Sequence, residues 1–273
     1  MLCLIGVCLV GEILCFIFVK EKPEIVVTSK RPSRQDLHQG LKALFHTPYF
    51  YIAIAMFTLN YYNSLSVVGI GKYYAQYVLG NENIFSLFGT VPMVTMAIGL
   101  LLTPLFSKIW SKRVVLVLAV SFVCLGNIAG SCFPFSFWAG FVGVMIKGFG
   151  SAVLMSQLFT LAPEVVTYIE LKIGIRVEGL AASANSFGQK IGSGLGTAVV
   201  FWALSICGYV AKAKTQSTGV IYTFITLYWW VPTAATLILL VLACFWNIET
   251  KIKALQTAKA LPATSSDNAT KEA

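Results

Sequence analysis

The sequence predicts an all-α polytopic membrane protein with about seven transmembrane helices, and three observations lead to this fold class. Of the 273 residues, 57% are hydrophobic and only 11% are charged, whereas soluble domains carry about 25% charged residues. Apolar runs of about 18 residues or more recur along the chain. The basic residues, which give a net charge of +9, lie mostly in short segments between those runs. This is the positive-inside pattern of membrane proteins, and it argues against nucleic-acid binding.

Seven apolar segments are long enough to cross a bilayer as helices. The first carries Glu12 near its middle, but it lacks the basic start and the A-x-A-like cleavage site of a secretory signal peptide. We therefore interpret it as a true span. In order, the predicted spans are residues 1–19, 49–71, 84–107, 113–132, 136–162, 180–210 and 219–246.

The Lys and Arg residues distinguish the two sides of the membrane. One set of alternate loops, with the C-terminal tail, carries Lys20, Lys22, Lys30, Arg31, Arg34, Lys42, Lys108, Lys112, Arg113, Lys172, Arg176, Lys251, Lys253, Lys259 and Lys271. The other set carries only Lys72, Lys212 and Lys214. Since the side rich in basic residues is cytoplasmic, we expect a multi-pass cell-membrane protein whose C-terminus is cytoplasmic and whose N-terminus lies outside.

Two segments are predicted to lie outside the bilayer. Residues 20–48 form a cytoplasmic middle loop that ends in an amphipathic stretch, typical of a short helix at the membrane surface. This stretch could serve as a linker between two helical bundles or as a gating element. Its apolar face carries Leu37, Leu41, Leu44 and Phe45. Residues 248–273 are polar and rich in Ala, Thr, Ser and Lys, which predicts a disordered cytoplasmic tail. Residues 49–247 are then a six-helix bundle.

Three charged residues fall near the middle of predicted spans: Glu12, Lys147 and Lys190. A charge at that depth costs about 2.5–3.5 kcal/mol on insertion scales and usually faces a cavity or a partner. For Lys147 two hypotheses stay open, an ion pair with Glu12 and a place in a substrate pathway. The adjacent Gly148 and Gly150 would let a neighbouring helix or a substrate approach closely.

The helix around Lys190 is predicted to have two different faces. At 100° per residue, one face within about 60° of Lys190 is polar. It carries Ser183, Ser186, Ser193 and Thr197. Gly188 and Gly192 lie on the opposite face, which is smooth enough for close helix packing. A helix of this kind is typical of transporters in which one face lines a substrate pathway.

Polar and aromatic residues also occur together at mid-depth in the span 49–71. The run N-Y-Y-N-S at Asn60–Ser64 offers hydrogen-bond donors, acceptors and aromatic faces. A pyranose ring has apolar faces and a polar rim, so this mixture suits a sugar. The alternative is hydrogen bonding between helices, worth about 0.6 kcal/mol on average.

The sequence contains no motif for catalysis or for metal binding. Its seven cysteines are scattered, without C-x-x-C, and its two histidines, His38 and His46, lie in the middle loop. There is no G-x-S-x-G, P-loop or H-E-x-x-H motif. We therefore expect neither an enzyme nor a metal site nor a resident cofactor.

Residues 163–190, P-E-V-V-T-Y-I-E-L-K-I-G-I-R-V-E-G-L-A-A-S-A-N-S-F-G-Q-K, resemble the glycoside–pentoside–hexuronide:cation symporter family, the family of melibiose permease. That family carries a loop D-x-x-D-Y-G-E-x-K-x-G-x-R-x-E and then a lysine in its eleventh helix. The matching residues are Tyr168, Glu170, Lys172, Gly174, Arg176, Glu178 and Lys190. Further matches are Tyr73, Tyr74, Tyr77, Gly80 and Ser111–Arg113. The chain departs from the pattern at Glu164, Thr167 and Ile169, where the family has two aspartates and a glycine.

The resemblance implies a major facilitator fold of twelve helices in two halves, of which this chain is equivalent to helices 6–12. It also implies a coupling cation, Na+ or H+, and a small sugar or glycoside as substrate. Because the family's cation-binding carboxylates lie in the amino-terminal half, we expect a truncated transporter whose missing half comes from the same gene or in trans.

The resemblance also assigns roles to residues. In the family, the lysine at Lys190 would contact the cation-site carboxylates and the substrate, and the polar residues before it would line the site. With the residues found above, the expected pathway comprises Lys190, Ser186, Asn185, Gln189, Ser183, Asn60 and Lys147. The expected cytoplasmic gate comprises Tyr168, Glu170, Lys172, Arg176 and Glu178.

Two other functions are also consistent with the sequence. The chain could be a non-transporting fragment, or a membrane subunit that only binds another protein. Alternatively, the same fold could carry a lipid-like cargo, although a polar site with Asn60 and Lys190 favours a small polyol.

Overall fold

The computed structural model describes residues 34–174, 178–211, 213 and 215–269, together with the single residues 6, 9 and 13. Gly6, Leu9 and Ile13 are helical; the rest of the predicted first span, with Glu12, lies outside the described residues. Throughout the described part the elements are helices, without β-strands. The predicted all-α fold class is therefore confirmed.

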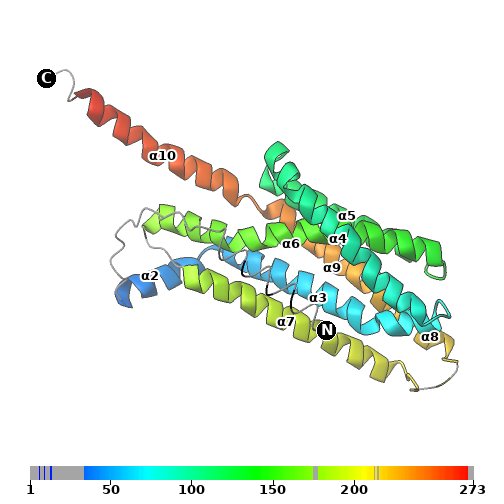
Figure 1. The fold of residues 1–273 in the computed structure, drawn as a ribbon. Helices are drawn as coiled ribbons and strands as arrows, with labels where there is room; N and C mark the ends of the chain where they lie inside the picture. Colours follow the sequence, from blue (N-terminus) through cyan, green and yellow to red (C-terminus); the bar gives the residue numbers. More distant parts are fainter. Residues whose placement is uncertain are drawn as a thin grey trace.

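The long helices lie side by side in one bundle, and the last helix projects from one end of it (Figure 1). In chain order the elements are α2 (Arg34–Phe45), α3 (Pro48–Tyr77), α4 (Asn83–Ile109), α5 (Lys112–Cys132), α6 (Phe137–Ile173), α7 (Glu178–Ile206), α8 (Thr218–Ile225), the π-helix η1 (Thr226–Trp230), α9 (Val231–Phe245) and α10 (Ile248–Ala269). Helix α6 packs between α4 and α5, and α3 packs against α7.

Four helical runs in the described part are long and apolar enough to cross a membrane. They are α4, α5, α6 and the run Thr218–Ala258. Helices α3 and α7 contain the polar stretches at Asn60–Ser64 and around Lys190. The six predicted spans from residue 49 onward all fall on these helices, with α8, η1 and α9 together forming the last one.

Helix α6 ends later than the sequence predicted. Residues 163–173 were expected in a cytoplasmic loop, but α6 continues to Ile173. The extension is helical because Val165, Val166 and Ile169 are buried against the bundle at i, i+1 and i+4. Gly174 then ends the helix with a φ of 77°, the left-handed conformation that glycine adopts most readily.

The predicted disordered tail is also wrong for residues 248–269, which form α10. Ile248 is fully buried, and Ile252 packs against the core. Lys253 Nζ lies 2.8 Å from Glu249 Oε1, an ion pair across one helical turn. Ala, Lys, Leu and Gln are strong helix formers, so a composition typical of a polar tail also suits a helix.

Close helix packing depends on glycines, as predicted for Gly188 and Gly192. A Cβ atom at Gly192 would collide with the Thr58 carbonyl of α3, and one at Gly188 would lie 3.0 Å from Phe57 Cβ. On α6, a Cβ at Gly148 would meet Pro92 of α4 at 2.9 Å. The predicted close-packing roles of these three glycines are confirmed.

Gly192→Ala should lower the stability of the bundle, whereas Gly194→Ala on the same helix should not. The new methyl group at residue 192 overpacks the contact of α7 with α3, which costs about 1–3 kcal/mol. A Cβ at Gly194 has no neighbour within 4 Å, so alanine there gains only helix propensity, about 1 kcal/mol. Thermal unfolding of both variants in detergent measures the difference. Equal melting temperatures would contradict the packing role of Gly192.

Candidate functional site

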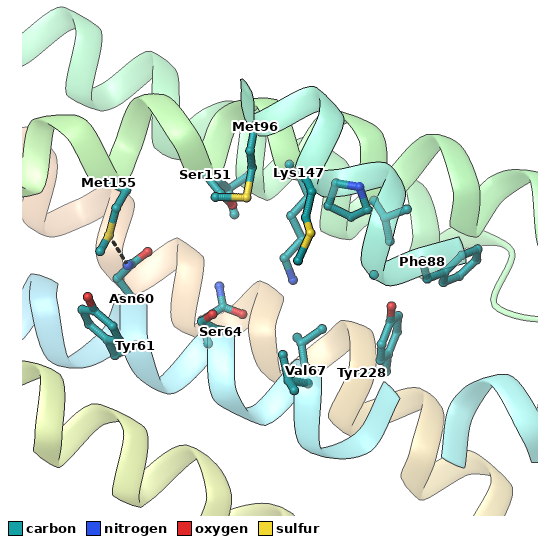
Figure 2. Close-up of a pocket in the computed structure, with 18 of the residues that line it drawn as sticks. Asn60, Tyr61, Ser64, Val67, Phe88, Met96, Lys147, Ser151, Met155 and Tyr228 are labelled. Carbon is teal, nitrogen blue, oxygen red and sulfur yellow. Dashed lines mark hydrogen bonds between the residues drawn. The ribbon is translucent and has the colours of Figure 1, made fainter. Parts of the chain in front are cut away.

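A cavity of about 410 Å³ lies between α3, α4, α6 and η1. Figure 2 shows side chains from α3 on one side facing side chains from α6 on the other. Its aromatic lining residues are Tyr61, Phe88, Tyr228 and Trp229, and its other polar lining residues are Asn60, Asn63, Ser64, Lys147 and Ser151. The size is within the range of about 300–1,000 Å³ that is common for small-molecule sites.

Lys147 is the charged residue among the described residues that line this cavity. It is held in place by the contact of α6 with α5, where a Cβ at Gly126 would lie 2.6 Å from the Lys147 backbone nitrogen. The side chain extends from α6 toward Ser64 and Val67 of α3 (Figure 2). Within the described ranges, no Asp or Glu lines the cavity and no carboxylate pairs with Lys147.

The α3 wall is formed by residues at helical spacing. Asn60, Ser64 and Val67 recur at i, i+4 and i+7, so they share one face of the helix. The Asn60 amide nitrogen donates to Met155 Sδ of α6 at 3.6 Å, which is a weak bond across the cavity. Asn60 and Lys147, expected in one pathway, thus lie in one cavity.

A buried polar cluster lies behind this wall. Thr236 Oγ1 of α9 donates to the Pro232 carbonyl at 2.7 Å. It also accepts from the amide nitrogens of Asn63 at 3.1 Å and Asn127 at 3.3 Å. The amide groups are oriented by these bonds, which leaves the Oδ1 atoms of both asparagines buried without a partner in the described part of the chain. Such unpaired acceptors are unfavourable unless water or a ligand reaches them.

The π-helix η1 places two aromatic rings at the cavity, and the sequence analysis missed both. Tyr228 stacks on Tyr74 with ring centroids 4.4 Å apart. The Trp229 ring is fully buried and fills a gap where a Cβ at Gly130 would collide with it. The available signal was Pro232. Proline cannot donate to residue i−4 and would clash with its carbonyl, and Val231 N–H instead bonds the carbonyl of Thr226, five residues back.

The α7 residues expected in the pathway lie elsewhere. Lys190, Ser186, Gln189 and Ser183 are exposed, and Asn185 is half-buried. Since the glycine face of α7 packs on α3, its polar face points away from α3, and none of these residues lines the cavity described above. The structure therefore separates the expected pathway into two groups, on opposite sides of α3.

Three of the five residues expected in the cytoplasmic gate, Tyr168, Glu170 and Lys172, lie near the end of α6. Tyr168 is half-buried and packs edge-on against Tyr49 of α3, with ring centroids 6.1 Å apart. Glu170 is half-buried and Lys172 is exposed. Arg176 lies outside the described residues, and Glu178 is the first residue of α7, with its side chain outside the described part.

Glu164 connects two of the motifs that carry the family resemblance. Its Oε1 lies 2.8 Å from Lys112 Nζ of α5, and its Oε2 accepts from Trp246 Nε1 at 3.1 Å. The carboxylate is buried, whereas the lysine is half exposed. Glutamate thus supplies a paired carboxylate where the family has an aspartate. In the described ranges no group of three His, Cys, Asp or Glu residues could hold a metal ion.

The sequence profile of the family described as "MFS/sugar transport protein" matches residues 1–250. The chain belongs to this family. It is therefore a multi-pass membrane protein of a transporter family, not an enzyme, and the resemblance found in residues 163–190 is confirmed at this level.

Proteins with curated names support the assignment. The chain is 31% identical over 213 residues to a protein of Escherichia coli K12 named as a sulfoquinovose importer, covering 75% of this chain and 44% of that protein. It is 27% identical to a Salmonella typhimurium protein named as a 2,3-dihydroxypropane-1-sulfonate exporter and to the glucuronide carrier protein homolog of E. coli, each covering 88% of this chain and 52% of the relative. The chain thus spans about half the length of these relatives.

Glu164→Ala should destabilise the bundle by about 1–3 kcal/mol, because the buried Trp246 N–H loses its acceptor. The matched control is Glu249→Ala, which removes the Lys253 ion pair across one turn of α10, worth about 0.2–0.5 kcal/mol. It also removes an acidic side chain from the first turn of that helix, worth about 0.3–1 kcal/mol. Thermal unfolding in detergent compares the two. Equal melting temperatures of the two variants would show that Glu164 does not hold α5, α6 and Trp246 together.

Proposed function

We propose that this chain supplies the carboxy-terminal helices of a cation-coupled symporter for a sugar or glycoside. The observation that carries the proposal is the cavity between α3, α4, α6 and η1, in a chain whose family is described as sugar transport proteins. Relatives named as an isoprimeverose transporter and a raffinose carrier protein support the solute class. The Tyr61 and Tyr228 rings suit the apolar face of a sugar, and Asn60 and Ser64 suit its hydroxyl rim.

The mechanism that fits this fold is alternating access, in which two helical bundles rock around a site at mid-depth. We propose that the polar face of α7 meets the complementary amino-terminal half, from the same gene or in trans. Lys190 would then bind the carboxylates that hold the coupling Na+ or H+, with Ser183, Asn185, Ser186 and Gln189 beside it. Its exposure in the described chain supports this role, since a charged side chain at membrane depth needs a partner.

The end of α6 is proposed to belong to the cytoplasmic gate, with the C-terminus on the same side. Tyr168 and Glu170 lie there, next to Lys172 and close to the start of α7. The ion pair of Glu164 with Lys112 supports this proposal, because it connects the end of α6 to the start of α5. A non-transporting fragment is the less favoured alternative, because the named relatives are transporters.

Lys190→Ala should abolish accumulation of solute against its gradient. The loss of a hydrogen-bonded charge weakens coupling by about 1.5–3 kcal/mol, which is roughly a tenfold to hundredfold effect. The measurement is uptake of solute into vesicles, driven by a Na+ or H+ gradient. The vesicles contain this chain expressed together with the coding sequence next to it in the gene. Lys108→Ala, at the exposed end of α4, should accumulate solute like the parent. Accumulation by Lys190→Ala at the parent rate would remove Lys190 from the mechanism.

A further inference from the structure

The cavity between α3, α4, α6 and η1 contains a positive charge with no counter-charge. Lys147 lines it, and no acidic side chain does so within the described ranges. The other lining groups are aliphatic side chains, amides, hydroxyls, aromatic rings and thioethers, none of which neutralises an ammonium group. A lysine at membrane depth is unfavourable without a partner, so the cavity is electrostatically suited to a negatively charged occupant.

Hydrogen-bonding groups on the α3 wall of the same cavity suit an occupant with hydroxyl groups. Asn60 and Ser64 line the cavity, and neither side chain is buried. The amide group and the hydroxyl group can each donate and accept hydrogen bonds. An occupant with hydroxyl groups can pair with both, because a hydroxyl group also donates and accepts.

The position of Lys147 makes it available to such an occupant. Its backbone is fixed by the close contact of α6 with Gly126 of α5. Its side chain crosses the cavity toward Ser64 and Val67 (Figure 2). An ammonium group is a compact charge with three donors, so it binds the oxygens of a carboxylate or of a sulfonate without demanding one planar geometry.

We propose that Lys147 is a specificity-determining residue that binds the anionic group of the transported solute, a small hydroxylated carboxylate or sulfonate. This inference rests on the proposed transport function and adds the charge of the solute to it. The same side chain could instead pair with Glu12, which lies outside the described residues. In that case the cavity would be neutral and would not select for charge.

Three matched probes test the proposal: methyl β-glucoside, methyl β-glucuronide and methyl 6-deoxy-6-sulfo-β-glucoside, which differ only at carbon 6. Exchange of each labelled probe is measured in vesicles that contain the chain with the sequence that adjoins it in its gene. We expect the parent to exchange at least one anionic probe about tenfold faster than the neutral one, as expected for a charged hydrogen bond. Which anion is preferred distinguishes a carboxylate from a sulfonate site.

Variants assign the preference to Lys147. Lys147→Met should bring the ratio of anionic to neutral exchange close to one, Lys147→Arg should retain the preference, and the exposed control Lys108→Met should match the parent. The amount and melting temperature of each variant are measured in detergent. If Lys147→Met does not fold, the selectivity of the parent and of Lys147→Arg still decides the matter.

Different failures have different meanings. Equal exchange of all three probes by the parent would overturn the inference and leave sugar transport standing. Exchange of none of them would count against the proposed function itself. If Lys147→Met slows all three probes in proportion and Glu12→Gln in the same chain restores them, Lys147 belongs to an ion pair and the inference is wrong.

Discussion

The close approach of helix backbones is the constraint on which the rest of this structure depends. In a bilayer the apolar side chains have no strong preference for each other over lipid, so helices associate where small residues let their backbones meet. Helix α6 meets α4 at Gly148 and α5 at Gly126, while α7 meets α3 at Gly192. Bulkier residues there would push the helices apart, and the cavity between α3 and α6 would lose its shape.

Aromatic and polar groups then fill the space that these contacts define. At one end of the bundle, Tyr74, Tyr228 and Trp229 pack together. In the middle, Thr236 ties α9 to α3 and α5 through two asparagines. At the other end, Glu164 ties α6 to α5 and to Trp246. With connections at three levels, the helices are suited to move as one body, as the proposed rocking mechanism requires.

Hydropathy was sufficient to predict α4, α5, α6 and the last helical run, which are long and apolar. Helices α3 and α7 were also predicted, although polar stretches interrupt their apolar residues. Hydropathy could not predict that α6 extends to Ile173 or that α10 forms. Both depend on tertiary contacts, which bury Val165 in the first case and Ile248 in the second. The site shows the same limit. Lys147 and Lys190 look alike in sequence, both charged, at mid-depth and near glycines. Helical spacing correctly predicted that the glycine face of α7 packs closely, but only the tertiary arrangement shows that Lys147 faces the cavity and Lys190 does not.

The π-helix η1 also means that the last span cannot be counted as a regular α-helix. A π-turn contains an additional residue, so every side chain after Trp230 is rotated by about 100° from where an uninterrupted α-helix would place it. The register of Thr236 with Asn63 and Asn127 therefore depends on the chain length through residues 226–230 as well as on its side chains. Evolution can exchange one apolar residue for another in this span, but the loss or gain of a single residue would detach α9 from its partners while leaving the hydropathy of the span almost unchanged.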